Sequence, residues 1–130
     1  MAGINYIIDT NIIIELFRGN EKIKASFKKE DKFYLPFAVL GELYLGAYRS
    51  SNSKKHLSQI NEFLNICTVL IADKETSNQY GILKTMLLKK GKPIPENDIW
   101  IAAITKQFKM KLITLDKHFL EIDVIDVLKL

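Results

Sequence analysis

The feature that most constrains the fold is a strand pattern that alternates with helical patterns along the chain. Residues 4–8 are rich in apolar, β-branched side chains and end at Asp9, as expected for a buried strand. Similar strand patterns cover residues 33–35, 67–71, 111–115 and 124–127, and helical patterns cover residues 11–17, 21–29, 36–48, 54–65, 74–90 and 97–108. This alternation predicts an α/β fold with three layers and a central, mostly parallel sheet of about five strands.

The length and composition favour one domain spanning residues 1–130. Hydrophobic residues make up 48% of the chain, which is enough for a full core, and no linker or repeat interrupts it. No apolar stretch reaches the ~20 residues that a membrane span needs, and no basic residue precedes the first apolar stretch. The single cysteine, Cys67, has no partner within the chain. We therefore expect a cytoplasmic protein without a signal peptide.

The positive charge permits a polyanionic partner without requiring one. The formal net charge is +4, and composition alone favours an ordinary lysine-rich surface. Arg18 and Arg49 are the only arginines, and each follows a segment that carries a candidate site acid. Arginine suits contact with phosphate, so both are candidate substrate-binding residues. The alternative is a solvated helix end.

Three acids lie at the predicted element boundaries. Asp9 and Asp116 each follow a predicted strand, and parallel strands end at the same edge of a sheet. Asp98 lies near the start of the helix predicted for residues 97–108. The alternatives are helix capping for the two strand-terminal acids and interaction with the helix dipole for Asp98. Taken singly, none of these acids excludes the alternative.

Glu42 is expected to project from the core-facing side of its helix. Its neighbours at helical spacing are Ala38, Val39, Leu45 and Gly46, all of them apolar or small. A buried carboxylate needs a cation, a shifted pKa or a position at the rim of a site. The alternative is a salt bridge to a lysine or arginine elsewhere in the chain.

Together the four carboxylates point to a metal site. Converging carboxylates repel one another, and a divalent ion removes that repulsion. Mg²⁺ and Mn²⁺ prefer hard oxygen ligands, and a bound ion can activate water and stabilise a charged phosphoryl oxygen. The sequence therefore predicts a divalent-metal site whose catalytic and metal-binding residues are Asp9, Glu42, Asp98 and Asp116.

The segments IIDTNIII, GELYLG, PENDIWIAA and ITLDKHF resemble, in order and spacing, the acidic motifs of PIN-domain nucleases, in particular VapC-type toxins of toxin–antitoxin pairs. The resemblance implies a PIN fold and a Mg²⁺- or Mn²⁺-dependent endoribonuclease that cleaves RNA by metal-activated water. It also implies a homodimer and a small VapB-like antitoxin, through which any contact with DNA would be indirect. It carries over the four acids and adds two polar residues that orient them: Asn11 and Thr114.

Two competing interpretations were weighed. A haloacid-dehalogenase-like phosphatase requires Asp-x-Asp, whereas Asp9 is followed by Thr10 and Asn11. A PIN-fold binding module, acting with its antitoxin-like partner in DNA-binding regulation without significant nuclease activity, remains the alternative function.

His56 and His118 are expected on the surface, because two isolated histidines do not make a zinc site. Transfer, ribosomal and messenger RNA all fit as substrates.

Overall fold

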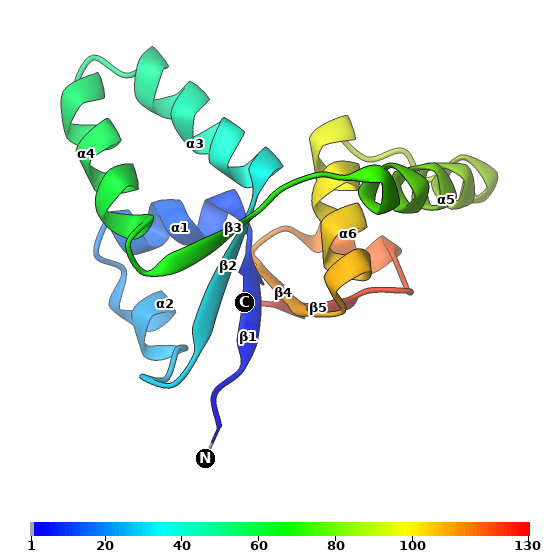
Figure 1. The fold of residues 1–130 in the computed structure, drawn as a ribbon, viewed down its shortest axis with the longest axis horizontal. Coiled ribbons are helices and arrows are strands. Elements are labelled where there is room, and N and C mark those ends of the chain that lie inside the picture. Colours follow the sequence, from blue (N-terminus) through cyan, green and yellow to red (C-terminus); the bar gives the residue numbers. More distant parts are fainter. Residues whose placement is uncertain (1) are drawn as a thin grey trace.

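Five parallel strands form one sheet between two layers of helices in the computed structural model, which describes residues 2–130 (Figure 1). The strands are β1 (Asn5–Ile8), β2 (Lys32–Pro36), β3 (Cys67–Leu70), β4 (Lys111–Thr114) and β5 (Asp126–Lys129). The helices are α1 (Thr10–Phe17), α2 (Glu21–Ala25), α3 (Phe37–Arg49), α4 (Ser53–Phe63), α5 (Lys74–Lys90) and α6 (Glu96–Phe108), followed by the 3₁₀ helix η1 (Lys117–Glu121). The predicted three-layer α/β fold with a parallel sheet is confirmed.

The strand order creates a crevice between β1 and β4. The order is β3-β2-β1-β4-β5. The chain therefore adds β2 and β3 on one side of β1 and then adds β4 and β5 on its other side. Helices α1 to α4 lie on one side of the sheet, and α5 and α6 lie on the other (Figure 1). Loops after β1 and β4 therefore diverge, and such switch points are where open α/β sheets hold their ligands. Asp9 and Asp116 follow these two strands.

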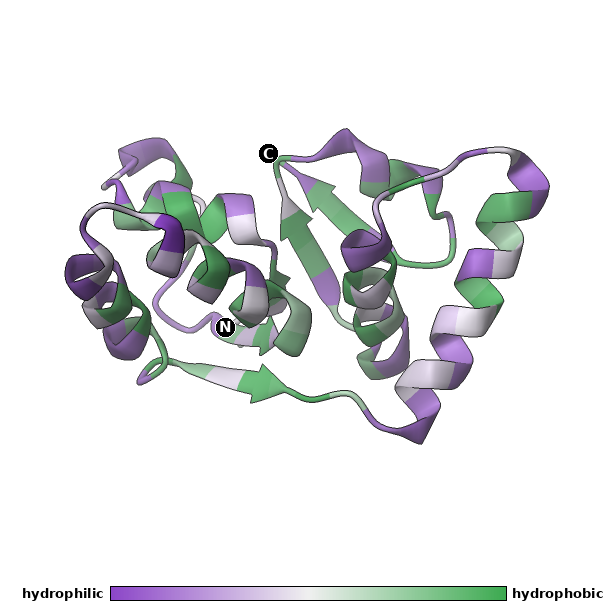
Figure 2. Ribbon diagram, turned by 90° about the horizontal axis from the view of Figure 1, so that it is seen from above, coloured by the Kyte–Doolittle hydropathy of each residue, from purple (hydrophilic) through white to green (hydrophobic). Residues whose placement is uncertain are grey.

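Buried isoleucines pack where β1, β4 and α1 adjoin. Ile8 of β1 pairs in register with Ile113 of β4, and both are fully buried. Ile12 and Ile13 of α1 are also fully buried. Each such side chain contributes ~1.5–3 kcal/mol when it leaves water. Figure 2 shows the hydrophobic residues on the central strands and inner helix faces, with hydrophilic residues on the loops and outer turns.

The predicted helix over residues 21–29 is too long, because α2 ends at Ala25. The cause is a carboxylate further along the chain. Asp31 accepts hydrogen bonds from the backbone N–H of Lys28 at 2.8 Å and of Ile4 at 2.9 Å. These bonds stabilise a turn in place of further helix and tie it to the start of β1.

The last strand is displaced from its predicted position at residues 124–127. Strand β5 spans Asp126–Lys129, and its parallel pairing with β4 matches Lys111 to Asp126 and Thr114 to Lys129. Residues 123–125 instead form a turn, with the Ile125 N–H donating to the Ile122 carbonyl at 3.4 Å. Among residues 2–130, no helix combines the length and apolarity needed to cross a membrane.

Candidate active site

Asp9 lies buried at the point where β1 ends and α1 begins, with 4% of its surface exposed. Its Oδ1 accepts a hydrogen bond from the Thr10 N–H at 2.8 Å, so this carboxylate caps α1. Burial is the largest influence on its pKa and raises it above the ordinary value. Hydrogen bonds from Thr114, Thr10 and Asn11 lower the pKa, whereas the charge of Asp116 raises it. Asp9 therefore does cap a helix, as the alternative interpretation held. It also lies close to a second acid, Asp116.

Thr114 and Asn11 connect the ends of β1 and β4. The Thr114 hydroxyl donates to Asp9 Oδ2 at 2.7 Å and accepts from the Asp116 N–H at 2.9 Å. The Asn11 amide donates to Asp9 Oδ2 at 3.2 Å, and its Oδ1 accepts from the Leu115 N–H at 3.1 Å. Four hydrogen bonds therefore fix the position of Asp9 relative to the segment that carries Asp116.

Glu42 lies at the boundary between the buried and exposed sides of α3. Ala38 and Val39, one turn earlier, are buried, but Leu45 is 58% exposed and Gly46 is also exposed. The expectation that Glu42 projects from the core-facing side of its helix therefore holds only in part, because Leu45 and Gly46 are exposed. The half-buried position leaves the carboxylate within reach of both the crevice and solvent.

Asn97 of α6 holds the Glu42 carboxylate. Its Nδ2 donates to Glu42 Oε1 at 2.6 Å and to the Ala38 carbonyl at 3.3 Å, which joins α6 to α3. Burial raises the pKa of Glu42, the Asn97 hydrogen bond lowers it, and the charge of Asp9 raises it. Among the described residues, Asn97 is the only group that donates to the Glu42 carboxylate with ordinary hydrogen-bond geometry, and it donates to Oε1, which leaves Oε2 with capacity for a ligand.

Asp98 lies in the first turn of α6 and is half-buried. Among residues 2–130, no group donates a hydrogen bond to its carboxylate. Burial and then the charges of Asp9, Asp116 and Glu42 raise the pKa of Asp98 to about 6, while His118 lowers it. Because the charges of three other acids act on this one carboxyl group, the four carboxylates lie near one another. They form an acidic cluster: Asp9, Glu42, Asp98 and Asp116.

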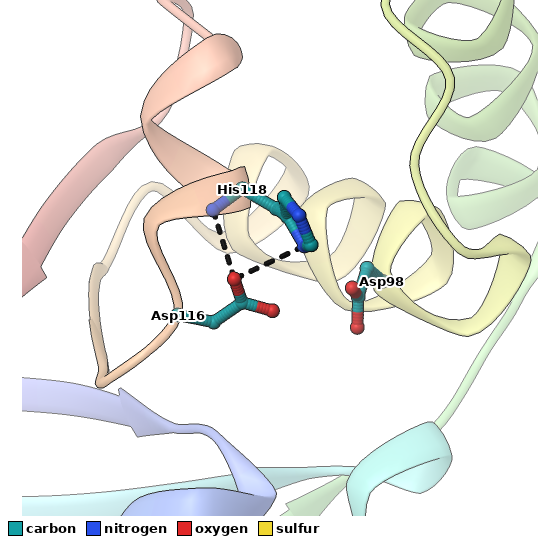
Figure 3. Close-up of side chains that lie close together, drawn as sticks. All are labelled: Asp98, Asp116 and His118. Atoms are coloured by element: carbon teal, nitrogen blue, oxygen red, sulfur yellow. Dashed lines mark hydrogen bonds and ion pairs between the residues drawn. The ribbon is translucent and has the colours of Figure 1, made fainter.

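Asp116 is contacted by His118, which lies two residues further along the chain. Asp116 Oδ1 accepts from the His118 N–H at 2.9 Å and lies 3.1 Å from the ring Nδ1. Figure 3 shows both contacts on one oxygen, with the other oxygen pointing toward Asp98. One potential ligand atom from each of Asp98, Asp116 and His118 lies within 4.8 Å of the others. His118 is exposed, as expected, but it is not isolated.

In the described part of the chain, the acidic cluster lacks a lysine or arginine to neutralise it. Within residues 2–130, no lysine or arginine forms an ion pair with any of its members, and Asp116 pairs only with His118. The salt bridge considered for Glu42 is therefore not formed there. The hydroxyl of buried Thr10 lies beside Glu42 and lowers its pKa, yet it forms no hydrogen bond of ordinary geometry with a described residue. Hard oxygen donors without a counter-charge fit a divalent ion.

The two arginines are placed differently. A cavity of about 430 Å³ between α1, α3 and α4 is lined by both Arg18 and Glu42, so Arg18 shares this cavity with one member of the cluster. Its Nη1 is 3.4 Å from Glu15 Oε1, an exposed pair that leaves most of the guanidinium free. Arg49, at the exposed end of α3, does not line this cavity.

Sequence reasoning missed Thr10, Asn97 and His118. Asn97 and His118 lie one and two residues from predicted site acids, in the segments PENDIWIAA and ITLDKHF. That proximity was the available signal for both. The contact between Asn97 and Glu42 joins residues 55 apart, so no local pattern could indicate it.

Comparison with known proteins identifies the family. The sequence model of the PIN domain matches residues 6–125. Ribonuclease VapC1 of Haemophilus influenzae strain R2866 is 33% identical over 113 residues, which is 84% of each chain. The structure of VapBC-1 from nontypeable Haemophilus influenzae is similar with a TM-score of 0.84 and 28% identity, covering 97% of this chain and 98% of that one.

The fold is also shared with VapBC2 of Rickettsia felis, solved bound to a DNA fragment from its promoter. The TM-score is 0.90 at 23% identity, covering 97% of this chain and 98% of that one. The family match spans nearly all of the chain, and the VapC1 relative covers most of it. The chain therefore belongs to the PIN-domain family and, within it, to the VapC ribonucleases of toxin–antitoxin systems.

Proposed function

We propose that this ribonuclease is a Mg²⁺- or Mn²⁺-dependent endoribonuclease whose ion is held by the acidic cluster. Asp9, Asp98 and Asp116 bind the ion, and Glu42 binds it directly or through water. The observation that carries the proposal is that oxygens of Asp98 and Asp116 lie within 4.8 Å of each other, close enough to Asp9 and Glu42 to feel their charges, without a lysine or arginine partner among the described residues. PIN nucleases are typically metal-dependent, which agrees with this donor set.

The side chains around the cluster prepare it for phosphodiester hydrolysis. When bound, a divalent ion would activate water and stabilise negative charge on the phosphoryl oxygens. Thr114 and Asn11 hold Asp9 in a fixed orientation, and Asn97 does the same for Glu42. Such supporting hydrogen bonds keep ligands in place and strongly influence affinity. The products expected from this chemistry have 5′-phosphate and 3′-hydroxyl ends.

Substrate contact in this proposal begins at Arg18. The guanidinium lines the cavity that also contains Glu42, so it can contact a phosphate next to the cleaved bond. Arg49 contributes a more distant phosphate contact. The net charge of +4 favours association with transfer, ribosomal or messenger RNA.

The relatives support a role for this chain in a toxin–antitoxin pair. VapBC structures contain toxin–antitoxin pairs, and one is bound to promoter DNA. In this proposal, residues 1–130 act as one domain of a cytoplasmic homodimer, neutralised by a small VapB-like antitoxin that also provides the contact with DNA. A protein that acts only in such a regulatory complex, without nuclease activity, is the alternative that the following experiment separates.

The test compares RNA cleavage by the wild-type chain, Asp9→Asn and Asp123→Asn. Asp123 has an 83% exposed side chain outside the cluster, so its variant is a matched control for the loss of one carboxylate. We expect Mg²⁺-dependent cleavage by the wild type and the control, and none by Asp9→Asn with its circular dichroism unchanged. Equal cleavage by all three chains contradicts the assigned chemistry. Absence of cleavage by all three folded chains favours the regulatory alternative.

A further inference from the structure

We propose that His118 supplies a nitrogen ligand to the divalent ion at the acidic cluster, which makes the site favour Mn²⁺ over Mg²⁺. The inference rests on the proposed function, because it concerns the ion that the carboxylates hold. It adds an imidazole to a donor set that otherwise contains only oxygen.

The His118 ring lies close to the oxygens of two members of the acidic cluster. Asp98 and Asp116 each offer an oxygen, and His118 offers a ring nitrogen, all within 4.8 Å of one another. Ligands on opposite sides of an ion with ~2.2 Å bonds lie ~4.4 Å apart. The upper limit on the separations of the three groups is close to this value, so they are near enough to surround one ion. The His118 side chain is 53% exposed, so its ring has room to move.

The carboxylates of the cluster differ in how many lone-pair sites remain available to bind an ion. A carboxylate has about four lone-pair sites, and Asp9 already uses three of them in hydrogen bonds from Thr10, Asn11 and Thr114. Asp98 accepts no hydrogen bond among the described residues, and one oxygen of Asp116 points toward it (Figure 3). The free donor atoms are thus concentrated on the side of the cluster where His118 lies.

The contact between His118 and Asp116 leaves the imidazole able to bind an ion. Nδ1 lies 3.1 Å from Asp116 Oδ1, while the backbone N–H of His118 already donates to the same oxygen at 2.9 Å. That oxygen keeps a donor if the ring turns toward an ion. The ring also has a second nitrogen, so the imidazole can bind an ion while retaining its contact with the carboxylate.

The chemical consequence is metal preference. Imidazole is a common ligand of transition ions, whereas Mg²⁺ keeps oxygen ligands and several waters. His118 therefore adds affinity for Mn²⁺ and little for Mg²⁺. Loss of the imidazole should reduce the ratio of the two affinities, which is a change that a purely structural role would not produce.

The experiment is pulsed electron paramagnetic resonance of Mn²⁺ bound to the full chain, with calorimetric titration of Mn²⁺ and Mg²⁺. The chain contains two histidines, so His118→Asn and the control His56→Asn together account for every imidazole. Asparagine can still donate to Asp116 but provides no imidazole nitrogen. We expect imidazole coupling in the wild type and His56→Asn but not in His118→Asn. His118→Asn should bind Mn²⁺ about tenfold more weakly and Mg²⁺ within about twofold of the wild type.

Four results overturn the inference. Imidazole coupling that survives in His118→Asn assigns the nitrogen elsewhere. Equal weakening of Mn²⁺ and Mg²⁺ shows that His118 only positions Asp116. Mn²⁺ bound without imidazole coupling, together with cleavage that still requires Asp9, removes this inference and leaves the proposed function intact. A wild-type chain that binds neither ion removes both.

Discussion

Replacing Asp98 with asparagine should stabilise the metal-free protein at pH 8. The pKa of this carboxyl is raised from 3.8 to about 6, so its charged form is disfavoured in the folded state. One pKa unit corresponds to ~1.4 kcal/mol, which gives an upper bound of ~3 kcal/mol. Partial exposure and screening reduce this to ~1–2 kcal/mol. Loss of the favourable interaction between Asp98 and the helix dipole subtracts ~0.3–1 kcal/mol. The expected net stabilisation is ~1 kcal/mol.

The pH dependence has a definite sign. A carboxyl whose pKa is higher in the folded state binds protons more tightly there, so wild-type stability falls as pH rises from about 4 to about 6. Asp98→Asn removes that dependence. The difference between the two proteins should therefore be small at pH 4 and fully developed above pH 6. Mg²⁺ should reverse the order, because only the intact cluster gains stability from binding it.

Urea unfolding in the presence of EDTA measures this difference. Glu96→Gln is the matched control, because Glu96 begins the same helix and is 53% exposed in a 3.0 Å pair with Lys84. It makes the same chemical change outside the acidic cluster, so we expect a loss of ~0.5 kcal/mol rather than a gain. If Asp98→Asn and Glu96→Gln both destabilise the metal-free protein at pH 8, burial and repulsion do not disfavour the charged Asp98 carboxylate as the raised pKa requires.

Three further predictions use the same structure. Asn97→Ala should lower Mg²⁺ affinity and RNA cleavage about tenfold by releasing Glu42, and unchanged calorimetric affinity contradicts this. Mg²⁺ affinity measured by calorimetry should fall as pH drops through about 6, because protons compete for Asp98, whereas a flat profile contradicts its role. Gly91→Ala should destabilise the fold by ~1 kcal/mol, since Gly91 ends α5 with φ 66°. A Cβ added at Gly81 in the same helix meets no atom within 4 Å, so Gly81→Ala should stabilise the fold by ~0.5–1 kcal/mol. Urea unfolding measures both variants, and changes of the same sign in their free energies of unfolding contradict these two predictions.

Local patterns were sufficient to predict the fold class. Apolar β-branched runs and capped helices are encoded by neighbouring residues, so α5 has the predicted bounds and ends at Gly91. The strand order was not predictable locally, because it depends on pairing between distant segments such as β1 and β4. The same applies to β5, whose position is set by its register with β4.

The candidate site was predictable to a different degree for each residue. Asp9 and Asp116 could be placed at one edge because each lies within two residues of the end of a parallel strand. Glu42 required an estimate of which helix side is buried, and that estimate was only partly right. Its contact with Asn97 depends on how α3 and α6 pack, which helical periodicity does not specify.

Anomalous diffraction from crystals soaked in Mn²⁺ tests the central claim most directly. The account predicts a peak in the crevice between β1 and β4, within ~2.0–2.4 Å of carboxylate oxygens of Asp98 and Asp116. The peak should disappear in Asp98→Asn crystals grown under the same conditions. An occupied Mn²⁺ site elsewhere with none at the acidic cluster, or a lysine side chain inserted among these carboxylates, would contradict the account.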